Sequence, residues 1–260
     1  MHPAQIAIVR FAPGVRPKAA ERIDIATAPQ GGEPEWQPSL AALRNWLEQA
    51  KPKRAEIEFV LSDRLLHYAL VPWTDRVRKP AEETIFSRIY FENLFGKQAA
   101  GWHLKLASDG YGKARVGVAA EGALVDELKT LCTAHRLKLL RVTPYLMAVF
   151  NHWRKQLDGK NSVLAIAEAG SYLLGTFKNG EWHSLRRVAA GGLIGEDLPR
   201  AIEREVLLHG LEGKPKLYFH SPEHGLAGEI RRLPGMTILE WPTTGARPAS
   251  AAMAMASGGA

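Results

Sequence analysis

Cysteine is almost absent from this chain, and so are the long apolar runs that membrane segments need. Of its 260 residues only Cys132 is a cysteine, so neither an internal disulfide nor a cysteine-based zinc site can form. Cys132 falls in a helical apolar pattern, which indicates a small buried residue. The first fourteen residues lack the apolar core of a signal peptide, and no run approaches the roughly 18–20 apolar residues of a membrane span. We therefore expect a cytoplasmic protein.

Several catalytic signatures are missing as well. The sequence contains no GxGxxG, no GxxxxGK[ST] and no GxSxG motif, which removes support for a dinucleotide site, a P-loop and a serine hydrolase. His220 and His224 form a local histidine pair, but Pro222 prevents the continuous helix that a zinc site with this spacing needs. We therefore expect no metal site and no catalytic residues.

Acidic residues are outnumbered, with 34 Lys and Arg against 27 Asp and Glu and a net charge of +7. Such a balance admits nucleic acid, an anionic membrane surface or an acidic protein as partner. The basic residues are scattered along the chain, and no RNA-recognition signature interleaves them with aromatic residues. We expect no nucleic acid as partner, and a basic nucleic-acid-binding module stays an alternative.

What the chain does have is ordinary globular composition, 46% hydrophobic and 23% charged, and an informative stretch from Ser162 to Trp241. Asn179-Gly180 is a strong hairpin signal within it. The pattern predicts, in order, three strands, a helix, a strand, a short helix and a strand: Ser162–Glu168, Ser171–Lys178, Glu181–Val188, Leu193–His209, Lys216–His220, Glu223–Arg231 and Met236–Trp241. A three-stranded meander followed by alternating helix and strand is the order of one ribonuclease-H-like half of an actin-type ATPase fold.

The amino half holds a similar set of elements. We expect strands at Gln5–Phe11 and Arg22–Ala26, then a helix at Leu40–Gln49 with Ser39 as its N-cap. The further predicted elements are Glu56–Leu61, Leu65–Val71, helix Ala81–Phe95, Trp102–Ala107, Ala114–Ala119, helix Leu124–His135, Leu137–Val142 and helix Tyr145–Leu157. The predicted fold is therefore α/β, an actin-like, ribonuclease-H-like two-domain fold with an inserted subdomain in the first half.

The predicted domains follow from this order of elements. Residues 1–161 form a first domain with the insertion at about 72–121, and residues 162–242 form the second. Residues 243–260 are rich in Ala, Ser and Gly and contain no acidic residue, so we expect a disordered tail. Its deletion is then expected to leave the melting temperature nearly unchanged.

Three runs carry a family resemblance: Val60–Trp73, Arg141–Leu157 and Val163–Val188. They resemble the actin-like cytoplasmic platform proteins of type IV pilus and type II secretion machines, PilM-like proteins and the cytoplasmic part of secretion protein L, over roughly Glu56 to Val206. The resemblance implies a relative of actin-like ATPases that acts as a scaffold under an inner-membrane complex. Protein partners in that complex are implied, with peripheral membrane association through them. Where secretion protein L continues into a membrane span, this chain has a polar tail, so we expect a soluble member or one whose membrane part is another polypeptide.

The same family suggests where a nucleotide would bind. Its first phosphate loop begins with an acidic residue and a glycine, but Arg10, Phe11 and Ala12 stand there, so we predict that this loop is lost. At the second hairpin stand Glu168, Gly170 and Ser171. A carboxylate there would organise Mg²⁺-bound water, and the glycine would let the backbone approach a phosphate. The alternative is a plain β-turn that needs Gly170 for a positive φ.

Gly191-Gly192 precedes a predicted helix, whose free N–H groups and positive dipole end suit a phosphate. The resemblance places a nucleotide-contacting glycine pair here, whereas plain turn chemistry is the alternative. Glu196 and Asp197 follow and add negative charge that repels phosphate. We therefore predict a vestigial nucleotide site at Glu168, Gly170, Ser171, Gly191 and Gly192 with no cofactor, and binding of ATP and Mg²⁺ is the alternative.

The functional prediction is a non-catalytic scaffold that works by binding proteins, since phosphoryl transfer needs placed donors and a metal site. A weak Mg²⁺-dependent ATP-binding protein or ATPase is the alternative from the enzyme class. The predicted helix Ala81–Phe95 and the basic loop Arg76–Lys79 before it belong to the insertion. We expect a partner segment to dock near this insertion, and the alternative is an internally packed helix.

Overall fold

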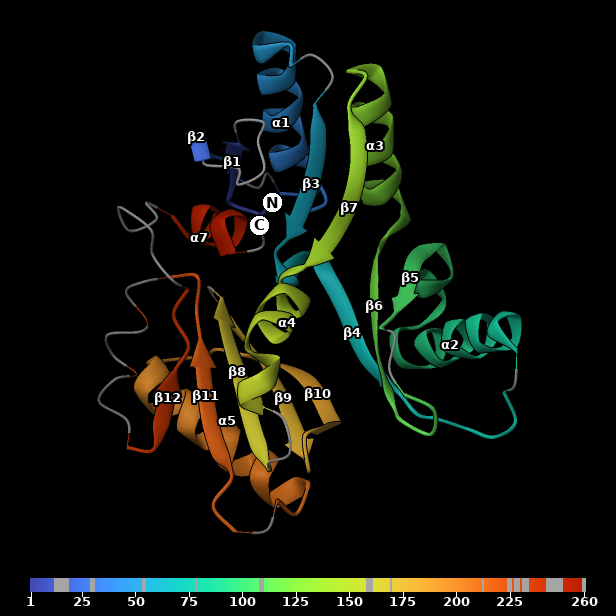
Figure 1. Cartoon of the computed structure of the whole chain (residues 1–260), viewed down its shortest axis with the longest axis vertical. Helices are drawn as coiled ribbons and strands as arrows, with labels where there is room; N and C mark the ends of the chain where they lie inside the picture. The colour runs from blue at the N-terminus through green and yellow to red at the C-terminus, as the bar shows by residue number, and fades with distance from the viewer. Residues whose placement is uncertain are drawn as a thin grey trace. The chain divides into compact units, whose positions relative to one another are not determined.

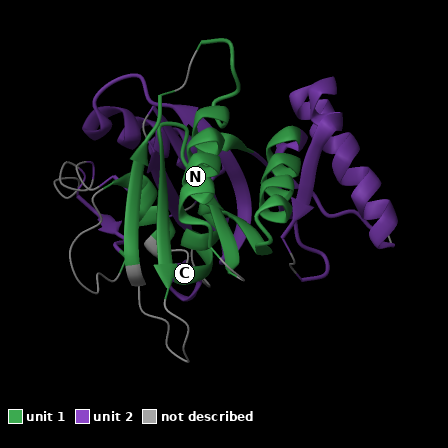
Figure 2. Cartoon of the chain, turned by 90° about the horizontal axis from the view of Figure 1, so that it is seen from above, with its two compact units in different colours: residues 1–66, 123–152, 241–260 green, residues 67–122, 153–240 purple. Residues whose placement is uncertain are grey.

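A computed structural model of the chain describes residues 1–11, 19–28, 31–52, 55–77, 79–107, 110–157, 161–168, 170–211, 213–223, 226, 230, 234–241 and 250–258. Helices and strands alternate, as expected for an α/β protein (Figure 1). Packing divides the chain into two compact units (Figure 2): unit 1 holds residues 1–66, 123–152 and 241–260, and unit 2 holds residues 67–122 and 153–240. The predicted boundary near Asn161 is drawn from element order rather than packing, and it stays a prediction.

Unit 2 contains the predicted meander within a five-stranded sheet of order β10-β9-β8-β11-β12. Strands β8, β9 and β10 form antiparallel hairpins, whereas β11 runs parallel to β8 and β12 runs parallel to β11. Asn179 and Gly180 have φ values of 52° and 80°, as the turn of a tight hairpin requires. The strands are β8 (Ser162–Glu168), β9 (Ser171–Lys178), β10 (Glu181–Ala189), β11 (Lys216–His220) and β12 (Met236–Ile238).

The last strand is shorter than the predicted Met236–Trp241. It ends at Ile238. The next residue, Leu239, still donates its N–H to the Phe219 carbonyl at 2.7 Å, and its carbonyl accepts from the His220 ring Nδ1 at 2.7 Å. Most of the short helix predicted near Glu223–Arg231 lies outside the described residues.

One face of this sheet is covered by helix α5 (Ile194–Leu208), as Figure 1 shows. Leu198 and Ile202 of the helix are buried in one cluster with Ala165 and Leu174 of the sheet. The helix begins one residue after the predicted start, and Gly210 with φ 51° follows its end, which is the usual position of a left-handed glycine.

The segment 67–122 forms a small α/β subdomain of unit 2. Its sheet has the order β4-β6-β5, made of β4 (Leu66–Val71), β6 (Arg115–Glu121) and β5 (Trp102–Leu106). Helix α2 (Pro80–Phe95) begins at a proline, one residue before the predicted start, and the first helical position accepts proline because it needs no N–H donor. Phe91 of α2 is buried against Ala69, Val71 and Trp102, so one side of the helix packs on the sheet.

Unit 1 is built from two separate ladders. Strands β1 (Gln5–Phe11) and β2 (Ala19–Ala26) pair antiparallel, and β3 (Glu56–Leu61) pairs in parallel with β7 (Lys138–Pro144). The helices of unit 1 include α1 (Gln37–Ala50), α3 (Gly122–Ala134) and the first part of α4 (Tyr145–Leu157), whose residues from Trp153 on belong to unit 2. Cys132 of α3 is buried, as predicted, and burial raises the pKa of its thiol.

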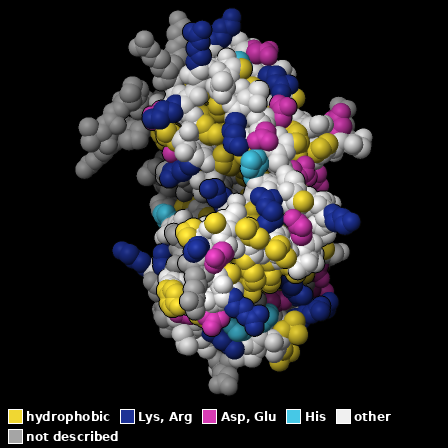
Figure 3. Space-filling view, turned by 90° about the vertical axis from the view of Figure 1, so that its right-hand side faces the viewer, with side chains coloured by type: hydrophobic (Ala, Val, Ile, Leu, Met, Phe, Trp, Pro, Cys, Tyr) yellow, Lys and Arg dark blue, Asp and Glu magenta, His cyan; other side chains and the backbone are white. Residues whose placement is uncertain are grey.

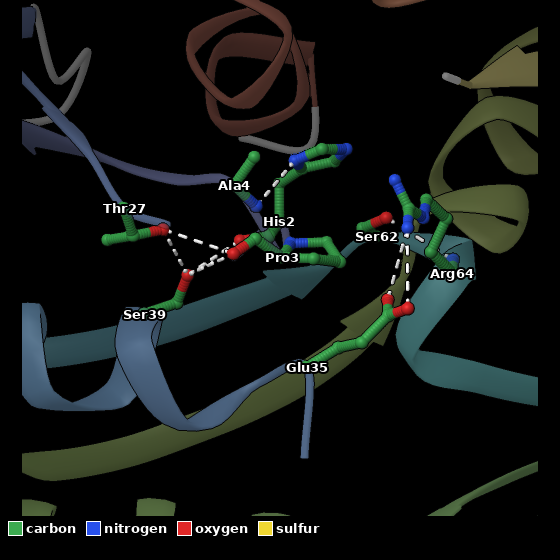
Figure 4. A network of polar contacts seen from close by, with 8 residues as sticks. All are labelled: His2, Pro3, Ala4, Thr27, Glu35, Ser39, Ser62 and Arg64. Atoms are coloured by element: carbon green, nitrogen blue, oxygen red, sulfur yellow. Dashed lines mark hydrogen bonds and ion pairs between the residues drawn. The ribbon is translucent and has the colours of Figure 1, made fainter. Parts of the chain in front are cut away.

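The predicted N-cap of α1 is wrong. The helix begins two residues before Ser39, with Trp36 as its N-cap and Pro38 in its first turn. Ser39 is fully buried, and its Oγ donates to the His2 carbonyl at 2.7 Å instead of capping the helix (Figure 4). The hydroxyl therefore links α1 to the start of the chain.

That link belongs to a polar network around the N-terminus (Figure 4). The Thr27 Oγ1 donates to the Pro3 carbonyl at 3.1 Å, and Arg64 forms an ion pair with Glu35 at 3.2 Å. The Met1 amino group donates to the Val60 carbonyl of β3, and the Met1 carbonyl accepts from the Ser62 N–H just after this strand. Residues 1–4 thereby tie β1, α1 and β3 together.

The C-terminal segment corrects the prediction of a disordered tail at 243–260. Residues Ala251–Gly258 form helix α7, which packs against β1, and Ala252 through Met255 are at most 3% exposed. Small residues alone indicated disorder, but alanine is the best helix former and its small side chain permits close packing. Residues 242–249, 259 and 260 lie outside the described part of the chain.

Among the described helices, none combines the length and the hydropathy of a membrane span.

Candidate functional site

The fold brings the predicted nucleotide residues together at one end of the unit 2 sheet. Glu168 ends β8 and lies opposite Ser171, the first residue of β9. Ser171 is also opposite Ala189, which ends β10. The Gly170 carbonyl accepts from the Ala190 N–H at 3.0 Å. The hairpin turn at Gly170 therefore adjoins the Gly191-Gly192 turn that follows Ala190.

The backbone geometry at Gly170 is compatible with both interpretations made from the sequence, a turn that approaches a phosphate and a plain β-turn. Gly170 has φ 80°, and an added Cβ would meet no atom within 4 Å, so glycine is needed here for conformation and the space beside it is open. Glu168 is only 4% exposed, which leaves almost no carboxylate surface for a hydrated Mg²⁺ ion. Ala169 lies outside the described residues.

At the second turn, the protein's own carboxylate occupies the position of an anion. The Gly191 N–H donates to Asp197 Oδ2 at 3.1 Å. A Cβ placed on Gly192 would lie 3.2 Å from the same oxygen, so the carboxylate lies directly against the turn. An amide that already donates to Asp197 is engaged, and the negative charge beside it opposes a phosphate.

The sequence predicted a negative charge at Asp197 but not its hydrogen bond with the Gly191 N–H. Asp197 lies in the first turn of α5, three residues after the helix begins. A carboxylate there is favourable for the helix dipole wherever it points. Only the fold of the Gly191-Gly192 turn brings the amide within reach, and no spacing rule in the sequence contains that information.

A buried carboxylate that sequence analysis missed lies on the same helix. Glu205 is fully buried and forms an ion pair with Arg186 of β10. His209 Nε2 lies 3.2 Å from Glu205 Oε2, and the Ser184 hydroxyl lies 3.4 Å from the same oxygen. The available signal was spacing, since Glu205 falls three residues after the buried Ile202 on the apolar side of the helix. A buried carboxylate with a cation and hydrogen-bond donors is a structural link between α5 and β10.

A histidine near this carboxylate has a perturbed pKa. Burial lowers the pKa of His183, and Lys178 and His209 lower it further. The rings of His183 and His209 contact edge to face, with centroids 5.3 Å apart. Among the described residues, no group of three or more His, Cys, Asp or Glu side chains has the geometry to hold a metal ion. His224 of the predicted histidine pair lies outside the described residues.

A shallow depression of about 540 Å³ lies at the opposite end of the same sheet. Lys155, Lys216 and Thr237 are among its lining residues. Lys216 pairs with Ser162 at the start of β8, whereas the candidate nucleotide residues lie beyond its end at Glu168. The depression is therefore distinct from the predicted site.

Helix α2 presents a second apolar side to solvent. Ile85 and Ile89 are 61% and 52% exposed, and Figure 3 shows hydrophobic side chains gathered on one face of the molecule. Ile85 and Ile89 are one helical turn apart and form a stripe. The internally packed alternative thus describes only the side of α2 that carries Phe91. A contiguous exposed apolar stripe is a feature of surfaces that bind other proteins.

Similarity to known proteins was found in the comparison with solved structures. No family model matches the chain, and no curated protein sequence is significantly similar to it. A chain of the PilM–PilN type IV pilus biogenesis complex superposes with a TM-score of 0.64 at 13% identity, covering 99% of this chain and 95% of that one. The cytoplasmic domain of EpsL, an inner-membrane component of the type II secretion system of Vibrio cholerae, gives a TM-score of 0.52 at 12% identity, covering 98% and 93%.

A third solved structure is a Bacteroides thetaiotaomicron protein of actin-like ATPase fold and unknown function. It gives a TM-score of 0.54 at 7% identity, covering 86% of this chain and 82% of that one. These likenesses confirm the predicted actin-like α/β fold class, and they confirm the resemblance to PilM and secretion protein L at the level of fold. Identity of this order shows a common fold, and fold alone does not establish function.

Proposed function

We propose that this chain is a non-catalytic, actin-like scaffold in the cytoplasm that binds partner proteins of a type IV pilus or type II secretion assembly platform. Association with the inner membrane is peripheral and runs through those partners. The supporting observation is the likeness over 99% and 98% of this chain to a chain of the PilM–PilN complex and to the cytoplasmic domain of EpsL.

The non-catalytic part rests on the hydrogen bond between Asp197 and the Gly191 N–H. Phosphoryl transfer depends on donors and a metal that are placed before the nucleotide arrives. Here a carboxylate engages the donor, Glu168 is buried, and Arg10 and Phe11 stand where the first phosphate loop would supply an acidic residue. The five residues Glu168, Gly170, Ser171, Gly191 and Gly192 then form a vestigial nucleotide site.

The alternative of a weak Mg²⁺-dependent ATP-binding protein is favoured by one observation. The Gly170 carbonyl bonds the Ala190 N–H, so the two turns that would hold a nucleotide have remained adjacent. Calorimetric titration with ATP and Mg²⁺ separates the two functions. We expect no heat from the unchanged protein and no thermal shift at millimolar ATP, and micromolar binding that depends on Mg²⁺ would establish the alternative.

The variant Asp197→Ala sharpens this test because it removes the competing carboxylate. It should gain weak ATP binding if Asp197 is what blocks the turn. Glu196→Ala is the matched control, since Glu196 is also in the first turn but pairs with Arg200 at 3.6 Å. It should bind no ATP.

The scaffold part is tested by crosslinked affinity capture from cells in which the machine is assembled. Inner-membrane assembly proteins should be enriched with the unchanged chain and lost with Ile85→Asp/Ile89→Asp on α2. The control is Leu207→Asp/Leu208→Asp, because these residues are 81% and 61% exposed on α5. If no envelope protein is enriched with the unchanged chain, the proposed function is wrong.

A further inference from the structure

The hairpin of unit 1 has an edge that its counterpart in unit 2 does not have. The ladder between β1 and β2 is regular from Gln5 opposite Ala26 to Arg10 opposite Glu21. Among the described residues, β2 pairs with β1 alone. In unit 2 the second strand of the meander, β9, has β8 on one side and β10 on the other. Within the described part of unit 1, no strand takes the place that β10 has beside β9.

Two charged residues of β2 remain without a partner among the described side chains. Arg22 and Asp24 are both exposed and form no ion pair within that part of the chain. They are two positions apart in a strand, so they lie on the same face of the hairpin. In contrast, Glu21 on the other face forms an ion pair with Arg10 of β1 at 2.7 Å. The charges of that other face are therefore satisfied within the hairpin.

The order Arg22-Ile23-Asp24 is complementary to itself when it is read antiparallel. If a second β2 pairs with the register centred on Ile23, Arg22 lies opposite Asp24 of the copy and Asp24 lies opposite Arg22 of the copy. Opposite charges directly across two strands favour pairing, and like charges oppose it. Registers centred on Arg22 or on Asp24 would instead place like charges opposite each other. The charge pattern therefore selects one register and a two-fold axis.

We propose that β2 pairs with β2 of a second copy of this chain, so that one antiparallel sheet of order β1-β2-β2-β1 crosses a two-fold axis. The sequence of β2 contains neither lysine nor proline, two of the residues that protect open edges against such pairing, and its charged residues Arg22 and Asp24 are the ones that pair across the axis. The second copy supplies at β2 the strand that β10 supplies at β9. This dimer depends on neither the nucleotide site nor the apolar side of α2.

Sedimentation velocity over a concentration series tests the dimer with the full chain. The unchanged protein should show a monomer–dimer equilibrium that shifts to monomer as salt is added. Arg22→Asp and Asp24→Arg should each weaken self-association about tenfold or more, since each places like charges across the axis twice. Both variants should keep the melting temperature of the unchanged protein, because both side chains are exposed.

A mixture of the two variants is the decisive arm. In the mixed dimer one copy carries aspartate at both positions and the other carries arginine at both, so each cross-strand pair again joins opposite charges and association should return to the level of the unchanged protein. A dimer that persists in both single variants uses another surface and overturns the proposal. So does an unchanged protein that stays monomeric at every concentration, or a mixture that associates no better than its components. Ile85→Asp/Ile89→Asp should leave this dimer intact, which separates its failure from that of the proposed scaffold function.

Discussion

The two units build related sheets, but from very different stretches of chain. In unit 2 all strands of the large sheet fall between Ser162 and Ile238, and they form one continuous set of ladders. In unit 1 the ladders β1-β2 and β3-β7 stay separate, and their strands come from both sides of residues 67–122, which belong to unit 2. Helix α7, from the far end of the sequence, then packs on β1. Unit 1, whose strands are not contiguous in the sequence, is therefore held together by segments that are distant along the chain.

The difference extends to what is buried in each unit. Every residue of β8 is buried, and Val163, Ala165 and Ala167 on one of its faces form one core with α5. Unit 1 has buried side chains of its own, such as Leu47, Leu124 and Leu128. In addition, it depends on contacts from the chain ends, such as Ser39 to His2 and the buried side chains of α7. Unit 1 should therefore be the more sensitive of the two to changes at residues near the termini.

The largest expected effect follows from breaking the contact of α7 with unit 1. Met255 is 1% exposed, and Met255→Ala removes most of a buried side chain. We expect a loss of roughly 2–5 kcal/mol in the free energy of unfolding. Deleting Ser250–Ala260 should cost more than this, contrary to the expectation from sequence that the tail contributes nothing. Chemical denaturation measures both.

The control for this change lies in unit 2. Leu207 is 81% exposed on α5, so Leu207→Ala should change the free energy of unfolding by no more than about 0.5 kcal/mol. If Met255→Ala were as mild as this control, α7 would not pack as the structure shows, and the contrast between the two units would lose its main support.

A smaller effect is expected from pH, and again in unit 1. Burial lowers the pKa of His2 from 6.5 to about 4, and Arg64 and the terminal amino group act in the same direction. Between these values the unfolded chain binds a proton that the folded chain does not. Stability should therefore fall as the pH drops from 6.5 to 4, by up to about 3 kcal/mol from this residue.

The variant His2→Asn isolates that contribution. His2 Nδ1 accepts from the Ala4 N–H at 3.2 Å, and the asparagine carbonyl can accept the same bond without titrating. Its stability should be flatter between pH 6.5 and 4 than that of the unchanged protein. His183→Asn in unit 2 should flatten the slope less than His2→Asn, since the pKa of His183 is also lowered but its side chain is exposed. Parallel profiles for the His2 variant and the unchanged protein would refute the assignment.

The sequence predicted local elements in both units and missed contacts between distant segments. In unit 2, β8, β9 and β11 have the predicted bounds, because apolar runs and the Asn179-Gly180 turn are local signals. In unit 1, β1 and β3 also have the predicted bounds, but the start of α1 and the helix at the tail were missed. Ser39 bonds to His2 and α7 packs on β1, and both contacts join residues that are far apart in the sequence. Local patterns carry no information on such contacts.

For the candidate site, too, the topology could be predicted from the sequence and the side-chain contacts could not. Strand order alone brought Gly170 and Gly191 to one end of the sheet, so their adjacency was predictable from topology. The hydrogen bond from Gly191 to Asp197 and the burial of Glu205 were not. Each depends on a side-chain direction that is fixed only when α5 packs on the sheet. The sequence shows which charged residues lie near a site, and the packing of the fold determines which groups these residues contact.

The smallest expected effects come from two glycines of unit 2, and they test how tightly its regular sheet is packed. A Cβ on Gly175 of β9 would lie 2.6 Å from a ring carbon of Trp182, whereas a Cβ on Gly195 of α5 would meet no atom within 4 Å. Gly175→Ala should therefore cost about 1–3 kcal/mol and perturb the tryptophan fluorescence. Gly195→Ala should be neutral or gain up to about 1 kcal/mol. Equal stability of the two variants in urea would mean that Trp182 does not pack on β9, and unit 2 would then be no better defined than unit 1.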